Sequence, residues 1–99
     1  MLNINKTIEN NKAVFALEGR LDTNTSASFE NQIREAAEKV DEFVFDFAKL
    51  DYISSAGLRV LLVSQKTMSK KGGMKIINVS ETVMEILEVT GFSDILTIE

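Results

Sequence analysis

The sequence predicts an α/β fold: one domain over residues 1–99 with a mixed, mostly parallel β-sheet and helices packed against it. Short apolar segments typical of strands alternate with amphipathic segments typical of helices. Capping residues and glycines separate these segments, because the chain contains no proline. A chain of 99 residues, 44% of them hydrophobic, is also long enough to bury one core. The expected element order is β-β-α-β-α-β-α-β.

The first two strands are expected to form an antiparallel hairpin. Apolar residues between Leu2 and Ile8 mark the first strand, and residues 13–18 mark the second. The polar residues 9–12 between them are typical of a turn. Gly19 is expected to end the second strand.

A first helix and a central strand follow the hairpin. Residues 22–26 are types that favour helix N-caps, and apolar residues then recur at helical spacing up to Val40. Residues 43–47 are aromatic and β-branched, which predicts a strand. Asp46 and Asp51 are expected to flank this strand as solvated ends.

The second half of the chain continues the alternation. A helix is expected to begin at Ser54 or Ser55 and to run to about Lys70, before two glycines at 72–73. The remaining elements are listed together: a strand at 74–79, a helix at 80–91 capped by Ser80, and a closing strand at 95–98. Because strands and helices alternate from the third strand on, those strands should pair in parallel through right-handed crossovers.

Composition excludes several kinds of chemistry. The chain has no cysteine and no histidine, which removes thiolate chemistry, the commonest general base and the commonest metal ligand. We therefore expect no metal, no cofactor and no catalytic residue. A net charge of −4 argues against direct binding to nucleic acid or an anionic membrane. No apolar run approaches the roughly 18 residues of a membrane span, and the N-terminus lacks a signal-peptide hydrophobic region, so a cytoplasmic location is expected.

Residues 54–57, Ser-Ser-Ala-Gly, are the most informative segment. A helix N-terminus can hold a phosphate, but serine there is most simply explained as an N-cap. A cap needs one hydroxyl, so one of the two serines is spare. Ala56 has a small side chain and Gly57 has none, so a partner's backbone could approach the hydroxyl closely. A catalytic serine is excluded because no base accompanies it.

Two charged residues each have two explanations, one as local structure and one as a partner contact. Asp22 suits a turn or cap, but its loop, like that of Ser54 and Ser55, follows a strand; both loops could share one end of the sheet and receive a basic group of a partner. Arg59 is expected in the first helical turn, where a cation is unfavourable. It is either a solvated side chain or one that meets an acidic partner group or shapes the field around Ser55.

Six segments together carry a family resemblance. They are Glu18–Asp22, Phe45–Phe47, Leu50–Ile53, Ser54–Leu58, Lys71–Gly73 and Thr90–Phe92. With these segments in the family's order over nearly all 99 residues, the chain resembles a STAS domain of the anti-sigma factor antagonist type.

The resemblance implies a partner-switching protein. Its unphosphorylated form would bind an anti-sigma factor that is itself a serine kinase with an ATP site, and so free the sigma factor. The kinase would phosphorylate a serine at the start of the second helix and end the binding. A phosphatase of the PP2C type would restore it.

The family motif Asp-Ser-Ser/Thr-Gly-Leu-Gly places the phosphorylated serine two residues before its first glycine, which corresponds to Ser55. Ser54 stands in place of the aspartate, Ala56 in place of a hydroxyl residue and Arg59 in place of the last glycine. Asp22 corresponds to an acidic position at the partner surface. The complete expected partner-binding set is Asp22, Thr23, Ser54, Ser55, Ala56, Gly57 and Arg59.

Two other function classes stay open. The chain could be an accessory STAS subunit of a transporter or signalling assembly, without a phosphorylation switch. It could also be an enzyme or a small-nucleotide sensor, although it lacks histidine, cysteine and a phosphate-binding loop. We expect a non-enzymatic monomer or weak dimer.

Overall fold

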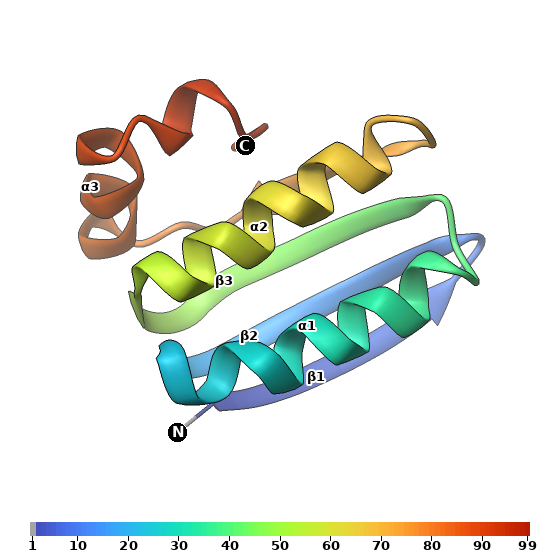
Figure 1. The fold of residues 1–99 in the computed structure, drawn as a ribbon, viewed down its shortest axis with the longest axis horizontal. Helices are drawn as coiled ribbons and strands as arrows, with labels where there is room; N and C mark the ends of the chain where they lie inside the picture. Colours follow the sequence, from blue (N-terminus) through green and yellow to red (C-terminus); the bar gives the residue numbers. More distant parts are fainter. Residues whose placement is uncertain (1) are drawn as a thin grey trace.

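The computed structural model describes residues 2–99. A four-stranded mixed sheet has the strand order β1-β2-β3-β4, and three helices accompany it (Figure 1). The elements are β1 (Leu2–Glu9), β2 (Lys12–Leu21), α1 (Thr23–Ala37), β3 (Glu42–Ile53), α2 (Ser55–Met68), β4 (Gly73–Ile77), α3 (Glu81–Val89) and a short 3-10 helix η1 (Phe92–Asp94). Within residues 2–99, no helix is both long and apolar enough to span a membrane.

The predicted hairpin is confirmed. β1 and β2 pair antiparallel, with Glu9 opposite Lys12. Asn10 and Asn11 form the two-residue turn, with φ of 51° and 66°. Asparagine is one of the few residues that adopts this left-handed conformation readily, so the turn follows from local sequence.

The predicted parallel crossovers are also confirmed. β2 pairs in parallel with β3 across α1, and β3 pairs in parallel with β4 across α2. Helices α1 and α2 lie side by side in front of the sheet (Figure 1). The main core fills the layer between them and the sheet.

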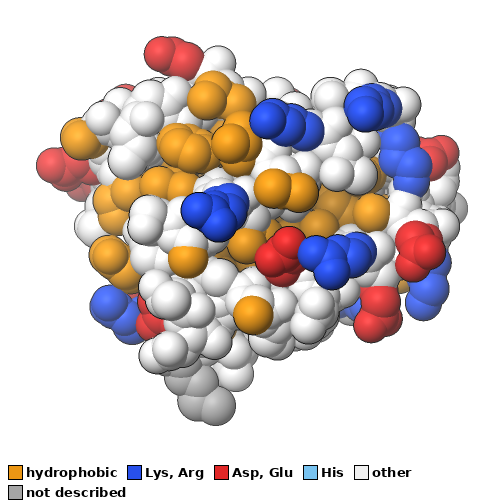
Figure 2. Space-filling view, in the orientation of Figure 1, with side chains coloured by type: hydrophobic (Ala, Val, Ile, Leu, Met, Phe, Trp, Pro, Cys, Tyr) orange, Lys and Arg blue, Asp and Glu red, His pale blue; other side chains and the backbone are white. Residues whose placement is uncertain are grey.

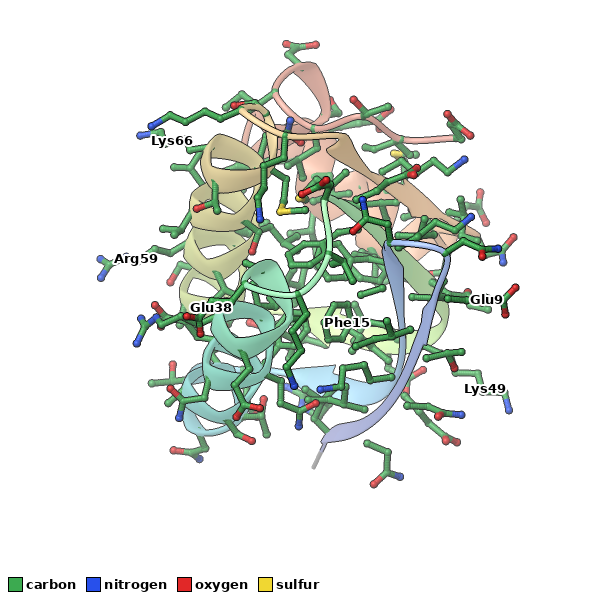
Figure 3. The ribbon with its side chains drawn as sticks, turned by 90° about the vertical axis from the view of Figure 1, so that its right-hand side faces the viewer. Glu9, Phe15, Glu38, Lys49, Arg59 and Lys66 are labelled. Atoms are coloured by element: carbon green, nitrogen blue, oxygen red, sulfur yellow. The ribbon has the colours of Figure 1, made fainter. Side chains whose placement is uncertain are left out.

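Phenylalanine side chains dominate this core. Phe15 of β2 lies between the sheet and the helices (Figure 3) and is fully buried. Its ring centroid is 5.4 Å from that of Phe43 and 6.1 Å from that of Phe29 in α1, both in edge-to-face geometry. Such pairs stabilise a core beyond their simple burial. They fix α1 over the centre of the sheet.

Both central strands are longer than predicted. β2 continues past Gly19, which has a φ of 107°, and register shifts beside it mark a bulge against β3. β3 runs on to Ile53, so Asp46 and Asp51 lie inside it rather than at its ends. The prediction failed because a bulge lets a strand continue where glycine and polar residues suggest an end. The extra length carries the ends of β2 and β3 directly to the starts of α1 and α2.

The predicted closing strand at 95–98 is wrong except for one contact. The chain forms η1 after Gly91, whose φ is 83°, and then makes a single parallel bridge between Ile98 and Ile76 of β4. Leu96 is buried while Ile95 is 49% exposed, so this segment does contribute to the core. Its hydrophobicity reflects that packing and not a strand.

Lys71 joins the far ends of the two long helices. Its Nζ donates to the carbonyl of Ala37, the last residue of α1, and to that of Val40, three residues further on. The next backbone N–H, of Gly72, donates to the Asp41 carbonyl at 2.7 Å. The bond to Ala37 satisfies a carbonyl that the helix end otherwise leaves unpaired, and the other two tie the loop after α1 to the end of α2.

Candidate functional site

The starts of α1 and α2 lie next to each other. Leu21, the last residue of β2, pairs with Ile53, the last residue of β3. The Ser54 backbone N–H donates to the Leu21 carbonyl at 2.8 Å. This confirms the prediction that the two loops share one end of the sheet.

Asp22 is the N-cap of α1. Its Oδ1 accepts from the backbone N–H groups of Asn24 at 3.0 Å and Thr25 at 3.1 Å, while Thr25 Oγ1 accepts from the Asp22 N–H at 2.9 Å. The bond from the Thr25 backbone is the main reason why the pKa of Asp22 is below its usual range. Oδ2 takes part in none of the hydrogen bonds found among residues 2–99. Asp22 therefore caps the helix with one oxygen, and the other oxygen is not used in the cap.

Ser54 is the N-cap of α2, and Ser55 is the spare serine. Ser54 Oγ accepts from the Gly57 N–H at 3.3 Å. Ser55 is the first helical residue and is exposed. Across residues 2–99, no hydrogen bond engages its hydroxyl. Its hydroxyl is thus free for chemistry or for a partner.

A hollow of about 330 Å³ lies beside Ser55, between the first halves of α1 and α2. It is lined by Ser26, Ala27 and Glu30 of α1 and by Ser55, Ala56, Arg59 and Val60 of α2. The surrounding surface carries hydrophobic side chains interspersed with charged ones (Figure 2). The lining of this hollow mixes apolar, hydroxyl and charged groups. Such a lining is more typical of a protein–protein contact than of a pocket for an apolar ligand.

Gly57 has a structural explanation that corrects the prediction. A Cβ on this residue would lie 2.8 Å from Leu21 Cγ and 2.9 Å from Ile53 Cγ1. The bare Cα therefore faces the core, and its missing side chain lets α2 pack against the ends of β2 and β3. It does not leave room for a partner's backbone.

Arg59 lies one position beyond the first turn of α2, because the helix begins at Ser55. The predicted conflict with the helix dipole is correspondingly smaller, since that effect falls off within the first turn. Its side chain extends away from the body of the protein (Figure 3) and is exposed. No ion pair within residues 2–99 includes it.

The sequence reading missed three contributors to this end of the molecule. Thr25 completes the capping box of Asp22, and its spacing of three residues was an available signal. Arg20 and Tyr52 form a cation–π pair, with the guanidinium carbon 4.4 Å from the ring centroid. They meet because the register shift between β2 and β3 places them opposite each other. No local sequence pattern predicts that pairing.

Thr23 is exposed at the start of α1. Of the seven predicted partner residues, six are at least partly exposed at the starts of α1 and α2, and only Gly57 is buried. Nothing within residues 2–99 groups three or more acidic side chains in a way that could hold a metal ion. The arrangement offers a hydroxyl, one free carboxylate oxygen and one unpaired guanidinium.

Comparison with known proteins decides the family. The model of the STAS domain family matches residues 3–99. The chain belongs to the STAS domain family. Over 78 residues it is 38% identical to BtrV of Bordetella bronchiseptica, a candidate anti-sigma factor antagonist, covering 74% of this chain and 67% of that one. It is 29% identical to the anti-sigma F factor antagonist of Paenibacillus polymyxa, covering 98% of this chain and 87% of the relative.

Solved structures with this fold include the anti-sigma factor antagonist SpoIIAA, a Bacillus cell fate determinant. Its unphosphorylated form matches with a TM-score of 0.78 at 18% identity, covering 98% of this chain and 87% of that one. Its phosphorylated form matches with a TM-score of 0.75 at 18% identity, covering 100% and 91%. At this identity the likeness establishes the STAS fold of the chain.

Proposed function

We propose that this STAS protein is an anti-sigma factor antagonist controlled by phosphorylation of Ser55. In its unphosphorylated form it binds an anti-sigma factor that is a serine kinase with an ATP site, and thereby frees a sigma factor. The binding surface consists of Asp22 and Thr23 at the start of α1, and of Ser54, Ser55, Ala56 and Arg59 at the start of α2. Gly57 supports that surface from below.

The free hydroxyl of Ser55 carries this proposal. Ser54 is occupied with capping α2, whereas Ser55 is exposed and has no hydrogen bond among the described residues. A kinase can therefore reach Ser55 without removing a cap. The names of the two relatives support the role, and SpoIIAA is a protein of the same fold with a phosphorylated form.

The reaction is a phosphoryl transfer carried out by the partner. A bond forms between Ser55 Oγ and the γ-phosphorus of ATP, the bond from that phosphorus to the bridging oxygen breaks, and ADP leaves. The hydroxyl proton goes to a base of the kinase or to water. This chain supplies only the acceptor, so it is a binding protein and not an enzyme.

Phosphorylation is expected to end binding without unfolding the protein. The phosphate adds about −1.5 to −2 charges. At the N-terminus of α2 this charge is tolerated by unpaired N–H groups and by the helix dipole. In the interface, the same charge faces the Asp22 carboxylate and the phosphates of the partner's nucleotide, and it must be desolvated. Repulsion and desolvation therefore weaken the complex.

The remaining parts of the pathway follow from this function. A PP2C-type phosphatase would hydrolyse phosphoserine 55 and return the protein to its binding form. The protein would act in the cytoplasm as a single STAS domain, monomeric or weakly dimeric, and without direct contact to nucleic acid or membrane. An acidic net charge of −4 favours a protein partner over a polyanion.

The test is capture of partners from extract of the native cell with Ser55→Ala and Ser55→Asp as baits. We expect the Ser55→Ala bait to retain a protein with a kinase fold and an ATP site, and the Ser55→Asp bait to lose it. Purified partner and wild-type protein should then yield phosphate on Ser55 alone, read by mass spectrometry.

Ser69→Asp is the matched control, because it adds the same charge at the exposed C-cap of α2, the opposite end of the helix. It should bind like wild type. Equal binding by the Ser55→Ala and Ser55→Asp baits would contradict the switch and favour an accessory STAS subunit. Unfolding of the Ser55→Asp protein, seen by circular dichroism, would contradict the interface explanation.

A further inference from the structure

Arg59 is the fourth residue after Ser55 on α2. Side chains four residues apart on a helix are neighbours, with about 5–6 Å between their Cβ atoms. Helical side chains also lean toward the N-terminus, so a residue lies over the turn that precedes it. Arg59 is therefore placed to reach a group attached to Ser55, and both residues line the same hollow.

In the unphosphorylated protein, none of the ion pairs and hydrogen bonds found in residues 2–99 includes the side chain of this arginine. Of the side chains that line the hollow, Arg59 alone is basic and Glu30 alone is acidic. Glu30 is paired with Arg34 on its own helix, at 2.8 Å between Oε2 and Nη2. Arg59 instead extends into solvent (Figure 3). The hollow thus holds one unpaired cation within reach of the one unbonded hydroxyl.

We propose that Arg59 binds the phosphate of phosphorylated Ser55. This inference rests on the proposed function, since it concerns the state that the kinase produces. A guanidinium presents two parallel N–H donors that match two phosphate oxygens, and the pair forms within one helix without moving the backbone. The ion pair holds the phosphate against α2 and offsets its repulsion from Glu30 and from the Asp22 carboxylate.

The test measures the phosphate itself. Phosphoserine is inserted at position 55 during translation, and its second pKa is followed by phosphorus NMR at low salt. An adjacent cation favours the dianion, so Arg59 should lower this pKa. We expect the pKa to rise by roughly 0.5 unit in Arg59→Gln. Arg59→Lys, which keeps the charge but not the paired donors, should fall between the two.

Lys66→Gln is the control for the loss of one positive charge. Lys66 is an exposed cation on the same helix (Figure 3) but lies about 16 Å further along the axis than Ser55. It should leave the phosphate pKa unchanged. Equal pKa values in wild type and Arg59→Gln would overturn the proposal, provided that both proteins melt at the same temperature without phosphate.

The outcome is separable from that of the proposed function. Because phosphoserine is inserted without a kinase, a cell that never phosphorylates Ser55 would contradict the proposed function alone. A phosphate pKa that ignores Arg59 would contradict this inference alone.

Discussion

The start of α1 and the start of α2 lie side by side, but their hydrogen bonding differs. At α1, Asp22 and Thr25 each bond to the other's backbone, and Ser26 Oγ donates to the Asp22 carbonyl at 2.5 Å. At α2, the Ser54 hydroxyl accepts a single hydrogen bond, of 3.3 Å, from the Gly57 N–H. The first start is closed by its own side chains, whereas the second leaves Ser55 free. One helix is anchored and its neighbour is open to modification.

The largest expected effect comes from filling the space beneath α2 with Gly57→Ala. The new Cβ would press on Leu21 and Ile53, so despite the better helix propensity of alanine we expect a loss of about 1–3 kcal/mol in the free energy of unfolding. Urea unfolding measures it. In a Leu21→Ala background the loss should shrink, because the contact with the Leu21 side chain is gone while that with Ile53 remains. A Gly57→Ala protein more stable than wild type would show that the packing is not tight.

Removal of each cap compares the two helix starts directly. Ser54→Ala should lower the free energy of unfolding by about 0.5–1 kcal/mol, since it removes one long hydrogen bond. Asp22→Ala should lower it further, because it removes the acceptor of two backbone bonds and frees Thr25. Thermal unfolding of both variants gives the order. Equal losses would mean that the capping box formed by Asp22 and Thr25 contributes no more to the free energy of unfolding than the single Ser54 cap does.

Substitution of Ser55 should hardly change stability. Its hydroxyl makes no hydrogen bond among the described residues, so Ser55→Ala should change the free energy of unfolding by less than about 0.5 kcal/mol. Ser55→Asp should be stabilising by about 0.3–1 kcal/mol at low salt, because a negative charge at the first helical position favours the dipole. High salt should remove that gain. A destabilised Ser55→Ala would reveal a structural role for the hydroxyl.

The smallest effect is the pH dependence of the α1 cap. Hydrogen bonds hold the pKa of Asp22 below its usual range, so its contribution is present above the unfolded pKa and is lost as pH falls through the folded pKa. Asn can cap the helix without titrating. The melting temperature of wild type, measured relative to that of Asp22→Asn, should therefore fall on acidification from about pH 7 to about pH 2.

Ser54→Ala serves as the reference for this titration, because it removes a cap that carries no charge. Its difference from wild type should stay constant over the same pH range. A constant difference for Asp22→Asn as well would mean that the Asp22 cap does not depend on ionisation.

Local patterns predicted most elements because their causes are local. The Asn10–Asn11 turn, the capping residues before α1 and α2 and the glycines after α2 all act within a few residues. The predictions failed where a distant partner decides the outcome. The extension of β3 depends on its register with β2, and the 95–98 segment packs its apolar side chains without a continuous ladder.

The candidate site shows the same division. The sequence by itself determined that one end of the sheet carries two serines ahead of a helix, an aspartate ahead of another, and no base that could activate a hydroxyl. Only the tertiary structure decided which serine is free, because a cap depends on where the helix begins against the sheet. It also decided that Gly57 faces the core. The side chains that leave no room for a Cβ there are Leu21, at the end of the distant strand β2, and Ile53, at the end of the preceding strand β3.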